Sequence, residues 1–244
     1  MPSGVLPLST TEDAGAKGGL VSLVIGKVNE HIRANRLAVD DLLPSEGTFA
    51  ERFGVSRVVM REAFRSLAAM GIIDVGSGRR ARVSAIDSNV LGAMIDHAVH
   101  VEQISIQQIY DLRRTLEART VTLAAIRRSE SEADMILRLS HVMRDDFRDA
   151  DKVMEHDIAF HHAITAAARN PSFSLVLGGF EKVMRQTWPI GWRSRASDAL
   201  RLESIESHEE IARAIKVSDP QAAQVAMAEH FDKSVKALVS AGLI

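Results

Sequence analysis

One carboxylate and three imidazoles in the C-terminal half of the chain have the chemistry of metal ligands. Asp157 and His161 stand four residues apart, so both side chains project from the same face of a helix. His208 and His230 fall near the middle of the last two expected helices. Such a set, with no thiolate, suits zinc, nickel, manganese or iron. Each histidine taken alone fits a structural role better, so the prediction depends on the whole set.

A row of arginines in the N-terminal half has the chemistry to contact nucleic acid. Residues 52–82 contain seven arginines against two acidic residues, in a chain whose formal net charge is −2. Arg57, Arg61 and Arg65 recur every four residues, and like charges at that spacing destabilise an isolated helix by roughly 0.2–0.5 kcal/mol per pair. DNA opposite them would offset that cost, since arginine binds guanine edges and phosphate. A solvated charged face is the competing interpretation.

Three helices are expected to position this row. Apolar residues at helical spacing predict a first helix near residues 20–34. Ser45 and Ser56 are candidate N-caps of a short second helix and of the third helix, which carries the arginines. Gly54 lies between them and supplies a tight turn, so the pair of helices is typical of a helix-turn-helix.

A β-hairpin is expected to follow the third helix. Two short apolar runs flank Gly76-Ser77-Gly78, and Arg79, Arg80 and Arg82 on this hairpin are expected to reach the adjacent DNA backbone or minor groove. The order of elements predicts a winged helix-turn-helix domain over residues 19–85. Residues 1–18, rich in Ser, Thr, Gly and Pro, are expected to be a disordered tail.

Residues 86–244 are expected to form an all-helical bundle of six to seven helices, which makes the whole fold mainly α. Breaks are expected at Asn170-Pro171, at Trp188–Gly191 and at Asp219-Pro220. Trp188–Arg195 is interpreted as a packed corner between helices, with a flap over a pocket as the alternative. The helices are expected near residues 87–100, 104–128, 131–149, 151–168, 172–187, 197–217 and 219–240.

The composition excludes several other classes of protein. The chain has no cysteine, so disulfides and thiolate metal sites are excluded. Its apolar runs are far shorter than the ~20 residues of a membrane span, and its start does not resemble a secretory signal. A cytoplasmic protein with no membrane partner is expected.

The N-terminal domain resembles the GntR family of bacterial regulators. The resemblance implies that Ser56, Arg57, Arg61 and Gly78 contact operator DNA. Gly47 departs from the pattern, because many members carry a DNA-contacting arginine there. The segments that carry the resemblance are Leu43-Pro44-Ser45-Glu46, residues 50–57, Arg61-Glu62-Ala63-Phe64, Leu67 and Gly71-Ile72-Ile73.

The C-terminal half is similar to the FCD ligand-binding domain of the FadR-type GntR subfamily. The resemblance implies that Asp157, His161, His208 and His230 hold one divalent metal ion per chain inside the bundle, with zinc as the first choice. The residues that fit the FCD pattern are Arg113, Glu117, Asp157, Phe160, His161, Asn170, His208 and His230.

The same resemblance implies an effector, a small organic acid or sugar acid whose carboxylate binds the metal. Arg113 is then the expected partner of the anion, and Asn170 is a further pocket residue. The alternative for Arg113 is an ion pair with Glu117, one helical turn away.

The function expected is that of a homodimeric transcriptional repressor, not an enzyme, which the effector releases from an inverted-repeat operator. A metal-sensing regulator and a metal-free acyl-CoA sensor are alternatives within the family. A third alternative is a helical phosphohydrolase that uses the doublet His156-Asp157. It is disfavoured because consecutive helical residues point about 100° apart.

Overall fold

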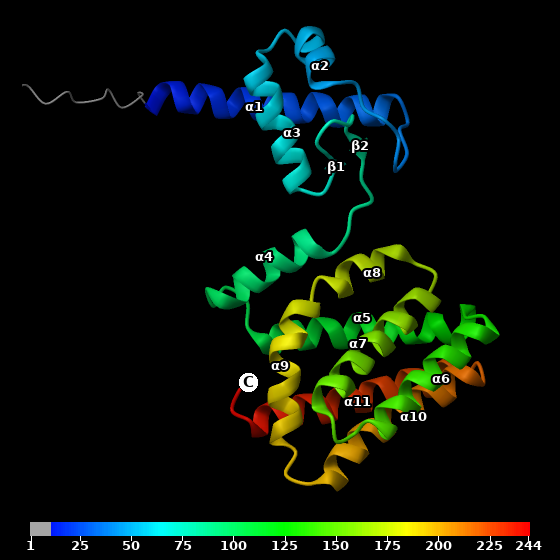
Figure 1. The fold of residues 1–244 in the computed structure, drawn as a ribbon. Coiled ribbons are helices and arrows are strands. Elements are labelled where there is room, and N and C mark those ends of the chain that lie inside the picture. Colours follow the sequence, from blue (N-terminus) through cyan, green and yellow to red (C-terminus); the bar gives the residue numbers. More distant parts are fainter. Residues whose placement is uncertain (1–10) are drawn as a thin grey trace, which may run out of the picture. The chain divides into compact units, whose positions relative to one another are not determined.

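A computed structural model of the chain describes the backbone of residues 11–244 and the side chains of residues 18–244. Residues 1–10 of the expected tail lie outside the described residues. The chain divides into two compact units, one ending at Asp87 and one running from Ser88 to Ile244 (Figure 1).

The N-terminal unit consists of three helices and a two-stranded hairpin, as the sequence predicted. Helix α1 begins earlier than the predicted Leu20, so residues 11–18 of the expected tail are helical. Residues 11–19 mix good helix formers with three glycines and show no apolar periodicity, so the sequence did not predict this part of the helix. The elements are α1 (Thr11–Ala34), α2 (Glu46–Phe53), α3 (Arg57–Ala69), β1 (Ile73–Asp74) and β2 (Arg82–Val83).

Local capping interactions define the helix-turn-helix. Ser45 Oγ accepts a hydrogen bond from the Thr48 N–H at 3.1 Å, and Ser56 Oγ accepts one from the Val59 N–H at 3.3 Å. Gly54 ends α2 in the left-handed conformation, with φ of +66°, and turns the chain into α3. Helices α2 and α3 pack on α1 through a core of buried residues that includes Val24, Val28, Phe49, Met60, Phe64 and Leu67.

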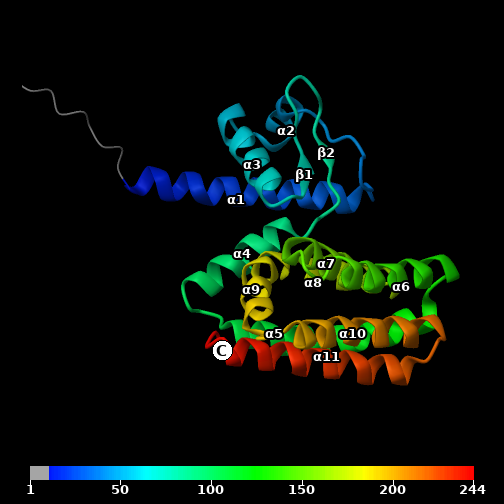
Figure 2. The same cartoon turned by 60° about the horizontal axis from the view of Figure 1, so that its bottom comes forward.

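Eight helices make up residues 88–244, all of which the structure describes. Helices α5, α10 and α11 lie side by side, α6 and α7 pack over them, and α9 crosses one end (Figure 2). The helices are α4 (Asn89–His100), α5 (Ile106–Arg127), α6 (Glu130–Asp145), α7 (Ala150–Ala167), α8 (Pro171–Gly178), α9 (Glu181–Ser194), α10 (Asp198–Lys216) and α11 (Pro220–Ser240).

The all-helical class is confirmed, but the prediction of six to seven helices with a break at Trp188–Gly191 was wrong. The expected helix over residues 172–187 ends at Gly178, because α4 approaches the chain closely there. A Cβ on Gly179 would lie 2.9 Å from Leu91 Cδ2. The next helix, α9, continues through Pro189, where tertiary packing outweighs the missing N–H. Trp188 and Trp192 stack one turn apart across that proline, with ring centroids 5.1 Å apart.

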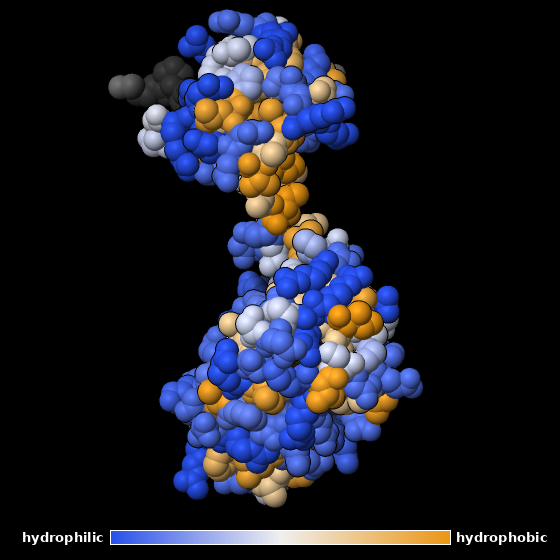
Figure 3. All heavy atoms as spheres, turned by 90° about the vertical axis from the view of Figure 1, so that its right-hand side faces the viewer, coloured by the Kyte–Doolittle hydropathy of each residue, from blue (hydrophilic) through white to orange (hydrophobic). Residues whose placement is uncertain are grey.

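Apolar side chains on the outer surface are scattered among polar ones on the face of the helical unit that Figure 3 shows. None of the described helices combines the length and the apolar character needed to cross a membrane.

We expect Gly54→Ala and Gly47→Ala to change the stability of the N-terminal unit in opposite directions. At the positive φ of Gly54 a Cβ costs about 1–2 kcal/mol. Gly47 lies in the first turn of α2, and a Cβ there would make an ordinary 3.7 Å contact with Ser45 Oγ. Alanine at that position stabilises by about 0.4–1 kcal/mol, because the unfolded chain loses freedom. Hydrogen exchange of α2 and α3 amides in the full-length protein measures both effects, and a change of the same sign in both variants would contradict the assigned turn.

Candidate metal centre and DNA-facing surface

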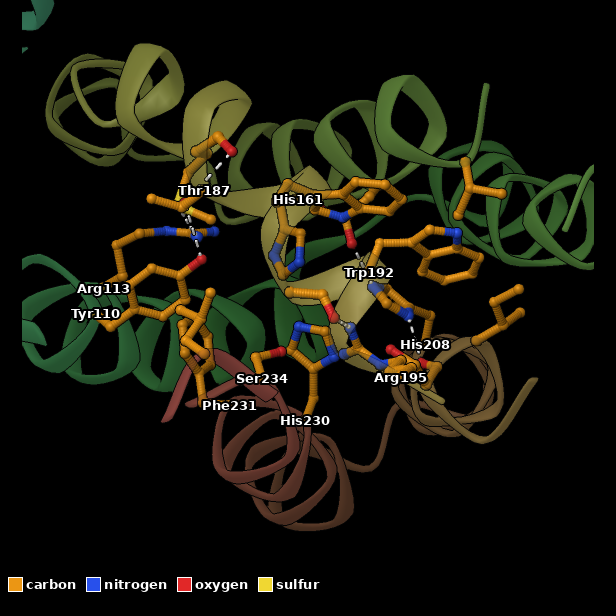
Figure 4. A pocket seen from close by; sticks show the side chains of 18 residues that line it. Tyr110, Arg113, His161, Thr187, Trp192, Arg195, His208, His230, Phe231 and Ser234 are labelled. Atoms are coloured by element: carbon orange, nitrogen blue, oxygen red, sulfur yellow. Dashed lines mark hydrogen bonds and ion pairs between the residues drawn. The ribbon is translucent and has the colours of Figure 1, made fainter. Parts of the chain in front are cut away.

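The structure brings the four predicted metal ligands together in the interior of the helical unit (Figure 4). Asp157 and His161 come from α7, His208 from α10 and His230 from α11. Each of the three imidazoles offers a nitrogen within 4.8 Å of the others, and all three residues are buried. Asp157 Oδ1 lies 2.8 Å from His208 Nε2. The i, i+4 pair therefore faces the two histidines of the neighbouring helices.

Each imidazole has its Nδ1 atom engaged by a protein group. His161 Nδ1 contacts the carboxylate of Glu117, His208 Nδ1 lies 2.9 Å from the Ser204 carbonyl oxygen, and His230 Nδ1 lies 3.2 Å from Ser207 Oγ. A carbonyl oxygen and an ionised carboxylate only accept, so His161 and His208 donate from Nδ1. Their Nε2 atoms are then left to act as ligands. Such partners orient histidines at metal sites in general.

Burial and neighbouring charges shift the pKa values within the cluster in different directions. Burial alone would lower the pKa of His161, but the carboxylates of Glu117 and Asp157 outweigh it and raise that pKa. Burial lowers the pKa of His230 well below its ordinary value, and His208 and His161 lower it further, so this ring is neutral at pH 7. Burial alone would raise the pKa of Asp157, but the adjacent His208 and the other nearby imidazoles hold it below its ordinary value. A carboxylate that stays ionised beside a neutral imidazole is a donor set suited to a divalent ion.

Glu117 contacts the cluster from α5, a role that sequence reasoning missed. Its carboxylate pairs with Arg113 at 2.6 Å and accepts from His161, and all three side chains are buried. The alternative prediction for Arg113, an ion pair within its own helix, is therefore realised, although Arg113 also lines the pocket. Burial alone would raise the pKa of Glu117, but Arg113 and His161 outweigh it and hold that pKa at about 2.

A small pocket adjoins the three histidines. Trp188, Trp192 and Arg195 of the α9 segment form part of its wall, so this segment is neither the packed corner that was favoured nor a separate flap. Tyr110 and Thr187 form another part, with their hydroxyl oxygens 3.2 Å apart. In Figure 4, Arg113 and Tyr110 lie to one side of His161, and Trp192 and Arg195 lie to the other.

Two sequence-based interpretations do not fit this arrangement. Asn170 does not line the pocket, because it is the N-cap of α8 and its Oδ1 accepts from the Ser172 N–H at 3.1 Å. His156 points away from the cluster, with its Nε2 atom 3.1 Å from Asp146 Oδ2. The doublet His156-Asp157 therefore cannot act as a joint ligand pair of a phosphohydrolase.

The predicted DNA-contacting residues of α3 lie on its exposed face. Ser56 caps the helix, and Arg57, Arg61 and Arg65 are exposed along it. Val58, which sequence reasoning did not assign to the DNA surface, is 59% exposed beside them. An exposed valine among arginines suits contact with a thymine methyl group.

The hairpin arginines separate into different roles. Gly78 turns the chain with φ of +72°, and Arg79 is exposed next to it. Arg80 instead donates from Nε and Nη2 to the Leu43 carbonyl oxygen, at 3.0 and 2.7 Å. This contact ties the hairpin to the chain before α2, so the guanidinium of Arg80 has a structural role that its sequence position did not indicate.

We expect Glu117→Gln to destabilise metal-free protein at neutral pH by about 3 kcal/mol, because it leaves buried Arg113 and His161 without their carboxylate. A carboxyl whose folded pKa is about 2 and whose ordinary pKa is 4.5 stabilises the fold fully above pH 4.5. That contribution is lost as the pH falls through 2, so variant and wild type should converge in acid. Thermal unfolding between pH 7 and pH 3 measures this. A constant difference across that range would contradict the assignment, and Glu130→Gln at an exposed carboxylate is the control.

Comparisons with known proteins place both units in one family. The model of the bacterial regulatory proteins of the gntR family matches residues 20–83, and that of the FCD domain matches residues 108–233. The HTH-type transcriptional regulator LutR of Bacillus subtilis is 28% identical, over 82% of this chain and 92% of its own length. The HTH-type transcriptional repressor NanR of Cronobacter sakazakii is 27% identical, over 89% of this chain and 84% of its own length.

A solved structure supports the same fold. Streptococcus agalactiae GntR aligns with a TM-score of 0.64 and 24% identity, covering 87% of this chain and 97% of that protein. The matched relatives are transcriptional regulators and not enzymes. The chain therefore belongs to the GntR family of bacterial regulatory proteins with a C-terminal FCD domain, and it is a DNA-binding transcriptional regulator.

Proposed function

We propose that this regulator is a homodimeric repressor that an anionic metabolite releases from an inverted-repeat operator. Residues 19–85 would bind DNA, and residues 86–244 would bind the metabolite. Each chain would hold one divalent ion, with zinc favoured over nickel, manganese or iron. The ligands would be Asp157, His161, His208 and His230.

The contact between His208 and Asp157 carries the metal proposal. His208 donates from Nδ1 to a carbonyl oxygen, so a neutral ring presents a lone pair at Nε2. His208 Nε2 lies 2.8 Å from Asp157 Oδ1. At this distance the lone pairs of the nitrogen and of the carboxylate oxygen repel each other unless a cation lies beside them. A divalent ion shared by the four groups supplies that cation, and a proton on His208 is the alternative that the tests below exclude or establish.

The charge around the pocket favours an anionic effector. The guanidinium of Arg113 is paired with the carboxylate of Glu117, whereas Arg195 forms no ion pair with any side chain that the structure describes. A divalent ion would add positive charge that no further carboxylate balances, because neutral imidazole ligands carry no negative charge. When bound, the ion would supply a Lewis-acid position that an oxygen anion can occupy. A small organic acid or sugar acid offers such an oxygen anion, and we propose it as the effector class.

Repression would follow from the placement of α3 in the major groove. Ion pairs of Arg65 with Glu62 and of Arg79 with Asp74 are exposed and therefore weak, so DNA phosphates can replace them. The name of the NanR relative supports the sign of regulation. The effector would release DNA by binding the DNA-incompetent arrangement more tightly, a coupling typically of about 1–3 kcal/mol.

We expect Arg57→Ala and Arg61→Ala each to weaken DNA binding by about 1–3 kcal/mol without loss of folding, since both side chains are exposed. Fluorescence anisotropy at fixed salt, with a duplex selected by the wild-type protein, measures the affinity. Arg138→Ala removes an exposed arginine of the other unit and should leave the affinity unchanged. Wild-type affinity in both α3 variants would refute the proposed DNA surface.

We expect His208→Ala and His230→Ala to lose stoichiometric zinc and the response to an organic-acid effector, while DNA binding persists. His162→Ala is the matched control, because His162 neighbours His161 on α7 but is half exposed and pairs with Glu181. Elemental analysis after dialysis measures the metal, and titration of the protein–DNA complex measures release. Normal release by the alanine variants would argue against the site. Release by zinc alone would favour the metal-sensing alternative.

A further inference from the structure

A second cavity adjoins the metal pocket, and the two share Arg195 and Ser204 as a common wall. This outer cavity lies between the end of α9, the start of α10 and the last turns of α11. Its lining includes Arg195, Glu203, Ser204, Lys233 and Lys236. The two spaces therefore meet at Arg195 and Ser204, so the guanidinium of Arg195 borders both of them.

The outer cavity carries an excess of positive charge. Arg195, Lys233 and Lys236 line it against one carboxylate, that of Glu203. Lys233 reaches Glu203 at 3.6 Å, a loose ion pair. Lys236 is exposed and forms no ion pair with any side chain that the structure describes. The unbalanced cations make this cavity a place for an oxyanion.

Arg195 lacks an anionic partner although it is partly buried. Its Nη1 donates to the Gly191 carbonyl oxygen at 2.6 Å, and its guanidinium lies over the Trp192 ring at 5.9 Å. Among the described side chains no carboxylate forms an ion pair with it, and burial lowers its pKa. Arg113, the other guanidinium of the pocket, is already paired with Glu117. Arg195 is therefore the better-placed group to receive a charge from the ligand.

We propose that the effector is an elongated dianion whose carboxylate lies at the histidine cluster and whose second oxyanion is held by Arg195 at the boundary of the outer cavity. Lys236 adds a weaker attraction from the outer side. The proposal rests on the proposed function, since it assumes that the metal pocket holds an organic acid. It adds the chemical class of the effector, which is a dianionic acid and not a simple monocarboxylate. It also assigns the specificity for the second anionic group to Arg195, which is not one of the four proposed metal ligands.

Matched pairs of acids test the assignment, because each pair differs in one carboxylate. Calorimetry on zinc-loaded protein would compare succinate with butyrate, glutarate with pentanoate, and adipate with hexanoate. We expect the best dicarboxylate to bind at least about tenfold more tightly than its monocarboxylate partner, the usual scale of one charge-assisted contact. We expect Arg195→Gln to abolish that preference, because it weakens binding of the dicarboxylate of each pair more than binding of its monocarboxylate partner.

Two further variants allow the dicarboxylate preference to be tested even if Arg195→Gln destabilises the C-terminal end of α9. Lys236→Gln, at an exposed side chain, should reduce the preference by about threefold, and Arg193→Gln, an exposed arginine on the same helix, should not change it. Equal binding of both members of every pair, or a preference that survives Arg195→Gln, would overturn the inference while the proposed function stands. Binding of the acids that is unaffected by removal of zinc would instead contradict the proposed function.

Discussion

The carboxylate of Glu117 accepts hydrogen bonds from two helices inside the C-terminal unit, from Arg113 one turn away on α5 and from His161 on α7. Removing such charges from water is costly, and it is tolerated only when every charged group finds a partner. Here the pairing also fixes the proton of His161 on Nδ1 and turns Nε2 toward the other imidazoles. The orientation of the cluster thus depends on a residue that does not belong to it.

The same contacts join four helices. Glu117 connects α5 to α7, Asp157 connects α7 to His208 on α10, and Ser207 on α10 contacts His230 on α11. An ion or a ligand at this junction would contact three of these helices directly. Helix α9 supplies another wall of the pocket and packs against α4, the first helix of this unit. A ligand in the pocket would therefore also contact the helix that supports α4. Binding at the centre can therefore bias how the whole unit is arranged.

Sequence reasoning succeeded where the deciding interaction is local. The caps at Ser45 and Ser56, the turn at Gly54 and the Asp219-Pro220 start of α11 are settled within a few residues, and the i, i+4 spacing of Asp157 and His161 places them on one face. The resemblance to FCD domains then selected His208 and His230, which spacing alone could not relate to α7.

Tertiary contacts account for the predictions that did not hold. Pro189 stays inside α9 because its neighbours pack around it, and Gly178-Gly179 end a helix because α4 approaches them. The hydrogen bonds from Arg80 to Leu43 join residues far apart in sequence, as does the contact between Glu117 and His161. The pair Asn170-Pro171 correctly predicted the start of α8. The sequence alone did not show that Asn170 caps this helix and does not line the pocket.

The central claim is that Asp157 and the three histidines share one divalent ion, and X-ray absorption spectroscopy of zinc-loaded protein tests it most directly. We expect one zinc per chain with three imidazole nitrogens and a carboxylate oxygen in its coordination shell, at about 2.0–2.2 Å. We also expect Glu117→Gln to alter the imidazole part of the spectrum while keeping the number of ligands. A zinc ion bound by fewer than three imidazoles, or no stoichiometric zinc in folded wild-type protein, would contradict the claim.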